Sequence, residues 1–161
     1  SGERHDDSFD LITRTLSAMG EITTVDMAIE SSGRHNFGVI GPDKTPVVTL
    51  PGDPVAAYIS IELFIRPMIR TMLGAATIHR PSVKAKLEKA ITSSGGYRSY
   101  IRAVLSEDGK SVLPLLSQGS SAQDEQATLS DANAFIAVPE GDSSIAAGSD
   151  VKVVVLERRY I

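Results

Sequence analysis

A strand, a rigid turn and a long apolar helix follow one another in the middle of the chain, and this succession constrains the fold more than any other feature. Residues 47–50 are rich in β-branched and apolar side chains, which is typical of a strand. The turn Pro51-Gly52-Asp53-Pro54 follows directly. Because proline favours the first turn of a helix, we predict a helix over residues 54–73 that ends at Gly74.

The predicted helix is apolar around most of its circumference. Its charged residues Glu62, Arg66 and Arg70 fall four positions apart and form one stripe, which we expect to be exposed. The rest of the helix surface should be buried, either under a sheet or in an interface between subunits. Pro67 has no N–H group, so we also expect it to kink the helix near Leu63.

Ahead of this segment, the sequence predicts one helix and two strands. Residues 6–8 offer helix N-caps, and apolar residues follow at helical spacing as far as a stop at Gly20. Residues 22–29 and 37–40 have the composition of strands. Gly41-Pro42-Asp43-Lys44 should join the second of these strands to residues 47–50 as a hairpin turn.

After Leu73 the pattern changes from helical spacing to short strands separated by turns. Residues 75–81 form a candidate linker, and the expected strands are 83–91, 97–105, 112–116, 134–138 and 151–157. Residues 123–129 are expected to form a helical turn. We therefore predict two domains, one over residues 1–75 and one over residues 76–161. The first contains too few β-α units for a complete doubly wound α/β domain, and the second is a small β-barrel or sandwich.

Composition excludes several classes of protein. The 161 residues carry a formal net charge of −4, whereas phosphate binding usually requires a basic excess, so we expect no nucleic-acid partner. The absence of cysteine excludes disulfides and zinc–thiolate sites. The most apolar stretch, residues 55–73, is interrupted by charges, and the first ten residues are polar, so we expect neither a membrane span nor a signal peptide. These features favour a cytoplasmic protein without a membrane partner.

The turn Pro51-Gly52-Asp53-Pro54 is the most informative candidate for a binding site. A turn between a strand and a helix places backbone N–H groups and the positive end of the helix at the edge of a sheet, where α/β proteins bind anions. Gly52 permits the close approach of a ligand, and the two prolines make the turn rigid. On spacing alone, a plain connection between a strand and a helix is the favoured interpretation.

The motifs around this turn resemble the C-terminal part of the molybdopterin molybdenumtransferases, a family that includes the E-domain of gephyrin. That family carries L-P-G-N-P-V-S, followed by an apolar helix with F-x-R-P and a closing leucine and glycine. Residues 50–56 read L-P-G-D-P-V-A, residues 64–67 read F-I-R-P and residues 73–74 read L-G, in the same order and without a gap. Residues 37–41, 96–102 and 132–141 also look like strands of that family.

This resemblance implies a fold, an activity and a set of site residues. The fold would be a partial molybdopterin-binding α/β domain followed by a C-terminal β-barrel domain, in a homodimer whose N-terminal domains are missing here. The activity would be molybdenum cofactor biosynthesis, in which molybdate is inserted into adenylylated molybdopterin with release of AMP and with Mg²⁺ as cofactor. Asp10 would be the catalytic and metal-binding residue, and the residues that bind molybdopterin would be Ser1, Gly2, Arg34, Pro51, Gly52, Asp53 and Pro54.

Several residues depart from the family pattern at positions expected to lie near phosphate. Glu3, His5 and Asp7 stand where the family has Gly, Ser and Gly, and Asp26 and Glu30 stand where it has lysines. Carboxylates repel anionic ligands. The sequence therefore supports a second hypothesis, a catalytically impaired homologue that binds a partner or acts as a scaffold.

The histidines offer weaker candidates. His5, together with Asp6, Asp7 and Asp10, could bind a divalent cation, but a solvated charged terminus explains the same residues more simply. His35 and His79 are isolated and lack the spacing of metal ligands.

Overall fold

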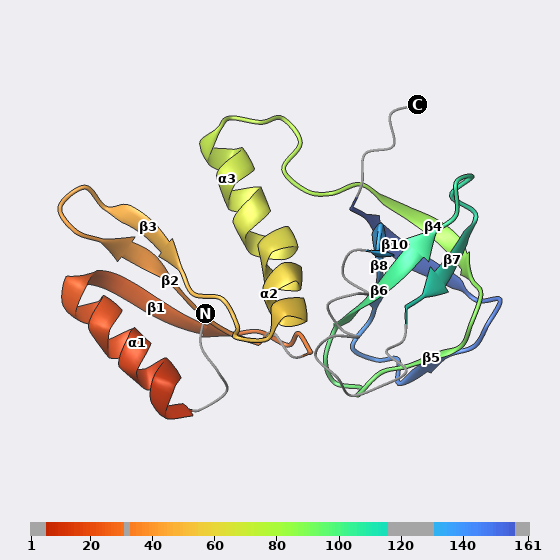
Figure 1. Ribbon diagram of the computed structural model, residues 1–161, viewed down its shortest axis with the longest axis horizontal. Coiled ribbons are helices and arrows are strands. Elements are labelled where there is room, and N and C mark those ends of the chain that lie inside the picture. Colours follow the sequence, from red (N-terminus) through yellow and green to blue (C-terminus); the bar gives the residue numbers. More distant parts are fainter. Residues whose placement is uncertain (1–5, 31–32, 116–130, 157–161) are drawn as a thin grey trace. The chain divides into compact units, whose positions relative to one another are not determined.

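A computed structural model describes residues 6–30, 33–115 and 131–156 of the chain. The chain divides into two compact units. Unit 1 comprises Ser1–Met27 and Ser31–Ile78, and unit 2, the barrel unit, comprises Ala28–Glu30 and His79–Ile161. Unit 1 contains α1 (Asp6–Met19), β1 (Gly20–Asp26), β2 (Arg34–Ile40), β3 (Thr45–Val48), α2 (Pro54–Ser60), the π-helix η1 (Ile61–Ile65) and α3 (Arg66–Met72) (Figure 1).

The sheet of unit 1 has the order β1-β2-β3 and is antiparallel throughout. Its registers pair Ile22 with Gly38 and Phe37 with Val48. Consecutive strands run antiparallel because each pair is joined by a short connection, which for β2 and β3 is the predicted turn at residues 41–44. The described residues therefore contain no parallel β-α-β element, which corrects the expectation of an α/β arrangement in this unit.

Helices cover both faces of this sheet. In β2, His35 and Asn36 are adjacent, so their side chains point to opposite faces. His35 contacts Ser60 of α2, and Asn36 contacts Thr13 of α1. Helix α1 therefore packs on one face of the sheet and α2 on the other, as Figure 1 shows.

The helix predicted over residues 54–73 has the expected start and end but an interrupted middle. It starts at Pro54 and ends at Met72, and Gly74 follows with a φ of 66°, as the glycine stop requires. Between α2 and α3, η1 is one turn of π-helix in which the N–H of Arg66 donates to the carbonyl of Ile61. Because Pro67 cannot donate to the ordinary helical partner, the wider turn absorbs the missing bond near the position where we expected a kink.

The prediction that Glu62, Arg66 and Arg70 form an exposed stripe on this helix is wrong. The Glu62 side chain is only 8% exposed, and Arg66 lies 3.9 Å from it. Arg66 and Arg70 also donate to the carbonyl oxygens of Ile78 and Thr77, because the chain after the helix folds back along it. Large apolar side chains are exposed instead, namely Ile61, Ile69, Met72 and Leu73.

Unit 2 is built on a closed five-stranded barrel with the strand order β10-β4-β7-β6-β8. This confirms the barrel prediction and excludes the sandwich. The strands are β4 (Ser82–Leu87), β6 (Ser99–Leu105), β7 (Ser111–Pro114), β8 (Ala134–Val138) and β10 (Asp150–Val155). Only the pairing of β4 with β7 is parallel among these ladders. The pair β5 (Ile91–Thr92) and β9 (Ser144–Ile145) forms a separate small sheet.

Alternating side chains fill the barrel. Along β4 and β10 the buried residues are Ala85, Leu87, Val151 and Val153, and the polar residues between them point outward. The strand predicted over residues 83–91 is broken after Leu87, and β9 was not predicted. The helical turn predicted at residues 123–129 lies outside the described residues. No helix in the described part of the chain is long and apolar enough to cross a membrane.

Candidate functional site

Three strand ends meet at one edge of the unit 1 sheet. Strand β1 ends at Asp26, β2 begins at Arg34 and β3 ends at Val48, and in an antiparallel sheet these three ends lie together. The turn at residues 51–54 leaves the same edge. The fold thus brings two of the predicted binding elements, Arg34 and the turn, to a single edge of one sheet.

Asp53 forms its hydrogen bonds with the first residues of helix α2. Its carboxylate accepts a hydrogen bond of 2.7 Å from the Ala56 N–H, and its carbonyl accepts one of 2.9 Å from the Ala57 N–H. Asp53 is therefore the N-cap of α2, with Pro54 in the first helical turn. Two of the N–H groups that we expected to be available to an anion are already bonded, whereas Gly52 is exposed. A ligand at this turn would therefore contact Gly52 and side chains.

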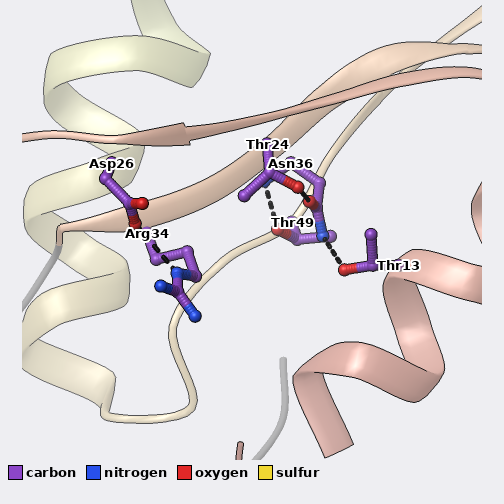
Figure 2. A network of polar contacts seen from close by, with 6 residues as sticks. All are labelled: Thr13, Thr24, Asp26, Arg34, Asn36 and Thr49. Atoms are coloured by element: carbon purple, nitrogen blue, oxygen red, sulfur yellow. Dashed lines mark hydrogen bonds and ion pairs between the residues drawn. The ribbon is translucent and has the colours of Figure 1, made fainter.

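Arg34 forms an ion pair with Asp26 across the end of the β1–β2 pair. Its Nε donates to the Asp26 carboxylate over 2.8 Å, and the two side chains are 51% and 69% exposed (Figure 2). The two residues are direct partners in the strand register. This cation is thus neutralised by one of the acids that replace the family lysines, so the edge is polar without a net positive charge from this pair.

Asn36, in β2, links α1, β1 and Thr49, the residue that follows β3 (Figure 2). Its side-chain oxygen accepts from the Thr24 hydroxyl over 2.7 Å, and its side-chain nitrogen donates to the Thr13 hydroxyl over 2.9 Å. Its backbone N–H donates to the Thr49 hydroxyl over 2.8 Å, and its carbonyl accepts from the Thr49 N–H over 3.0 Å. Asn36 is fully buried, and this network fixes Thr49 just ahead of the turn at residues 51–54.

His35 occupies the opposite face of the same strand. Its Nε2 lies 2.9 Å from the Ser60 hydroxyl, which donates to the Ala56 carbonyl over 2.8 Å. The ring also packs against Phe37 and Phe64. The donor in the contact between Nε2 and Ser60 depends on the tautomer of the ring, and Nδ1 is buried without a hydrogen-bond partner within the usual distance among the described residues. Burial lowers the pKa of His35, and the Gly33 backbone opposes this shift.

We predict that acid destabilises unit 1 through His35. Burial lowers the pKa of His35 in the folded protein below the ordinary value of 6.5, which we take for the unfolded chain. As the pH falls, the unfolded chain therefore binds a proton at His35 before the folded protein does. The free energy of unfolding should be constant well above pH 6.5 and should decrease as the pH falls through that value. Urea unfolding between pH 8 and pH 5, followed through the His35 ring signals by NMR, measures this dependence.

Two variants separate His35 from the other titrating groups. In His35→Phe the aromatic packing against Phe64 is kept and the titrating group is removed, so the decrease near pH 6.5 should become smaller when followed through the Phe64 signals. His79 is exposed, and His79→Gln should leave the dependence unchanged. An equal decrease in wild type and His35→Phe would contradict the assignment.

The remaining predicted site residues are only partly described. Ser1 and Gly2 lie outside the described residues. Asp10 lies in α1, one turn before Thr13, and its side chain is likewise outside the description. Among the described side chains, no three His, Cys, Asp or Glu residues come together as a metal site. The described side chains thus do not by themselves supply a Mg²⁺ site.

The sequence did not predict that His35 and Asn36 lie in a strand at this edge of the sheet. We expected β2 to begin at Phe37, whereas it begins at Arg34 and includes His35 and Asn36. Strand prediction relies on the alternation of apolar and polar residues. Two consecutive polar residues do not fit this pattern, even in a strand that is covered on both faces. The available signal was the pair of threonines, Thr24 and Thr49, on neighbouring segments of strand composition.

Comparison with known proteins supports the resemblance found in the sequence. Residues 84–156 match the family model described as MoeA C-terminal region (domain IV). Molybdopterin molybdenumtransferase 1 of Mycobacterium tuberculosis is 34% identical over 149 residues, which is 90% of this chain and 35% of that protein. Molybdopterin molybdenumtransferase 2 of the same organism is 38% identical over 109 residues, covering 68% of this chain and 26% of that protein. The chain thus spans about a third or less of the length of these relatives.

Solved structures show the same relationship. The crystal structure of the molybdopterin biosynthesis moea protein from Pyrococcus horikosii matches 93% of this chain and 36% of that chain, with a TM-score of 0.75 and 26% sequence identity. A second structure, a molybdenum cofactor biosynthesis protein from Pyrococcus furiosus, has a TM-score of 0.65 over 84% of this chain and 46% of that chain, and at 21% identity it supports the fold alone. The sequence motifs, the barrel and these matches show that the chain belongs to the molybdopterin molybdenumtransferase family and corresponds to its C-terminal part.

Proposed function

We propose that this chain is part of a cytoplasmic enzyme that inserts molybdate into adenylylated molybdopterin and releases AMP. The observation that carries the proposal is the L-P-G-D-P turn, held by the Asn36–Thr49 pair at the sheet edge that also carries Arg34. In this proposal Ser1, Gly2, Arg34 and the turn contact the pterin. Asp10 would contribute to catalysis and to Mg²⁺ binding together with ligands from outside the described residues.

The reaction would require domains beyond this chain, because the chain spans about a third of the relatives named above. The direct test is AMP release from adenylylated molybdopterin. We expect release that depends on molybdate when the chain is joined to the preceding domains of a relative, and none from the chain alone. If the joined protein binds adenylylated molybdopterin without molybdate-dependent release of AMP, the enzymatic proposal is wrong.

A specific observation favours the second candidate, a partner-binding or scaffold protein. The Arg34 guanidinium is paired with Asp26, and Asp53 adds a carboxylate to the turn, so this edge attracts anions less than a basic pocket would. Binding of pterin without turnover would support this candidate.

We also propose a homodimer. Ile61, Ile69, Met72 and Leu73 expose an apolar face on η1, on α3 and just beyond α3, and burial of such faces stabilises obligate interfaces. Light scattering on the chain joined to the preceding domains of a relative tests this, and a monomeric mass would contradict it.

The turn makes a quantitative prediction about pterin affinity. Asp53→Asn removes one negative charge and keeps the helix cap, because asparagine caps a helix about as well as aspartate. Relief of a like-charge contact at a partly solvated site should strengthen binding of an anionic pterin by about 1 kcal/mol, or roughly fivefold. Gly52→Val should weaken binding, because the side chain fills the space that the ligand needs. Titration with a phosphorylated pterin at low and moderate salt measures both effects.

Asp43→Asn is the matched control for this experiment. It removes the same charge from the exposed turn between β2 and β3, at the other end of that hairpin. Its effect on affinity should stay below twofold. If Asp53→Asn and Gly52→Val also change the affinity by less than twofold, the turn is structural only.

A further inference from the structure

The connection between β1 and β2 contains three residues that belong to the barrel unit. Ala28–Glu30 groups with His79–Ile161, although the residues before and after it belong to unit 1. Ile29 forms a parallel bridge with Arg98, immediately before β6. The Glu30 N–H donates to the Arg98 carbonyl over 3.0 Å, and the Arg98 N–H donates to the Ala28 carbonyl over 2.8 Å. Ala28–Glu30 thus forms an isolated parallel bridge with the barrel unit, supported by two backbone hydrogen bonds.

The side chain of Glu30 reinforces this pairing. The Ser94 hydroxyl donates to one carboxylate oxygen and the Ser99 hydroxyl donates to the other. Ser99 is only 2% exposed, and its hydroxyl lies 2.8 Å from that of Ser93. The Ser99 hydroxyl that donates to Glu30 is therefore held in place. Hydrogen bonds to an ionised acceptor are stronger than those between neutral groups.

The segment around Arg98, which pairs with Ala28–Glu30, is held by further contacts within the barrel unit. The Arg98 side chain forms an ion pair of 3.2 Å with Glu140, and the Gly96 N–H donates to the Glu140 carbonyl over 2.8 Å. On the side of unit 1, the Met27 N–H donates to the Gly33 carbonyl over 2.7 Å and closes the base of the connection. The chain therefore passes between the units after Met27, after Glu30 and after Ile78 rather than once.

We propose that Glu30 is a positioning residue whose carboxylate locks the β1–β2 connection onto the barrel unit. Glu30 aligns with a lysine of the family. Its presence therefore does more than remove a positive charge, because its carboxylate holds the loop between Asp26 and Arg34. The lock holds three residues of the connection that leads from Asp26 to Arg34. A consequence of this restraint for pterin binding rests on the proposed function, whereas the lock itself does not.

Amide hydrogen exchange on the chain, measured by NMR, tests the lock directly. In Glu30→Ala, the amides at positions 30 and 98 should exchange at least about tenfold faster, because each donates a backbone hydrogen bond in the bridge between Ala28–Glu30 and Arg98. Glu30→Gln keeps one acceptor oxygen and loses the charge, so its effect should be intermediate. The Lys86 amide, which donates to the Lys110 carbonyl in the barrel, should keep its exchange rate in both variants and reports on global unfolding.

Two further variants make the experiment decisive. Glu88→Ala removes another exposed carboxylate that accepts from a serine, Ser111, and it should leave the amides at positions 30 and 98 unchanged. Ser94 is exposed, and Ser94→Ala should accelerate both amides in the wild-type background but much less in Glu30→Ala. Changes below twofold in both Glu30→Ala and Ser94→Ala would overturn the lock. If Glu30→Ala also accelerates the Lys86 amide, Ser94→Ala alone decides.

Pterin affinity separates the lock from the proposed function. Glu30→Ala and Glu30→Gln remove the same charge and differ in the lock alone, so Glu30→Gln should bind a phosphorylated pterin at least about threefold more tightly. Equal affinities together with the expected exchange rates would show that the lock exists and does not position Arg34. Absence of pterin binding by the wild-type chain would count against the proposed function, and the exchange rates would still test the lock.

Discussion

Gly38→Ala is expected to destabilise unit 1 by about 3 kcal/mol, because the added methyl group has no space in the sheet. A Cβ at position 38 would lie 2.0 Å from the carbonyl oxygen of Glu21 and 2.9 Å from the Cα of Ile22. Both atoms belong to the backbone of β1, which is paired with β2 along its whole length. The clash can be relieved only by separating these strands, which would break hydrogen bonds near the Asn36 network.

Urea unfolding followed through NMR signals of each unit measures this effect. Signals of unit 1 should report the loss, and those of the barrel should change little, since two units need not unfold in one transition. Gly141→Ala is the control, because a Cβ at position 141 meets no atom within 4 Å. A loss below about 1 kcal/mol in Gly38→Ala would show that β1 and β2 are less closely paired than described.

Asn133→Ala is expected to destabilise the barrel by about 2–4 kcal/mol. The Asn133 side chain accepts from the Leu105 N–H over 2.7 Å and donates to the Leu105 carbonyl over 3.1 Å, and thus continues the ladder at the end of β6. Its backbone N–H donates to the Ala103 carbonyl, and its carbonyl accepts from the Leu156 N–H, so the residue joins β6 to the end of β10. Alanine keeps the backbone bonds and loses both bonds of the side chain.

Asn133→Asp distinguishes the two side-chain bonds. It keeps an acceptor for the Leu105 N–H and loses the donor to the Leu105 carbonyl, so its loss of stability should differ from that of Asn133→Ala. Ser111→Ala, which removes an exposed hydrogen bond to Glu88, should change barrel stability by less than about 0.5 kcal/mol. Unfolding is again followed through barrel signals. An effect of Asn133→Ala as small as that of Ser111→Ala would contradict the proposed role of the side chain.

The sequence by itself determined the elements that depend on near neighbours along the chain. The turn at residues 41–44 and the start of α2 at Asp53 and Pro54 are local, because turn residues and caps act within a few positions. The helix end at Gly74 is local in the same sense, and its φ of 66° is a conformation that glycine adopts without strain. The resemblance to the family also rests on these local motifs.

The environment of each side chain was decided only by the tertiary structure. Glu62 and Arg66 lie on the stripe that periodicity predicts to be exposed, yet the Glu62 side chain is only 8% exposed, and Arg66 donates to the carbonyl of Ile78, which follows the helix in the chain. His35 and Asn36 are buried together because helices cover both faces of β2. Periodicity describes one element at a time, and it contains no information about which segment will cover that element.

Long-range pairing also decided the roles of the charged residues at the candidate site. Asp26 and Glu30 read in the sequence as equivalent losses of positive charge, but Asp26 neutralises Arg34 whereas Glu30 fastens the connection to the barrel unit. Closure of the barrel through the parallel pair β4–β7 is long-range in the same way. A carboxylate binds whichever donors the fold brings within about 3 Å, and for Glu30 these donors lie more than 60 residues away in the chain.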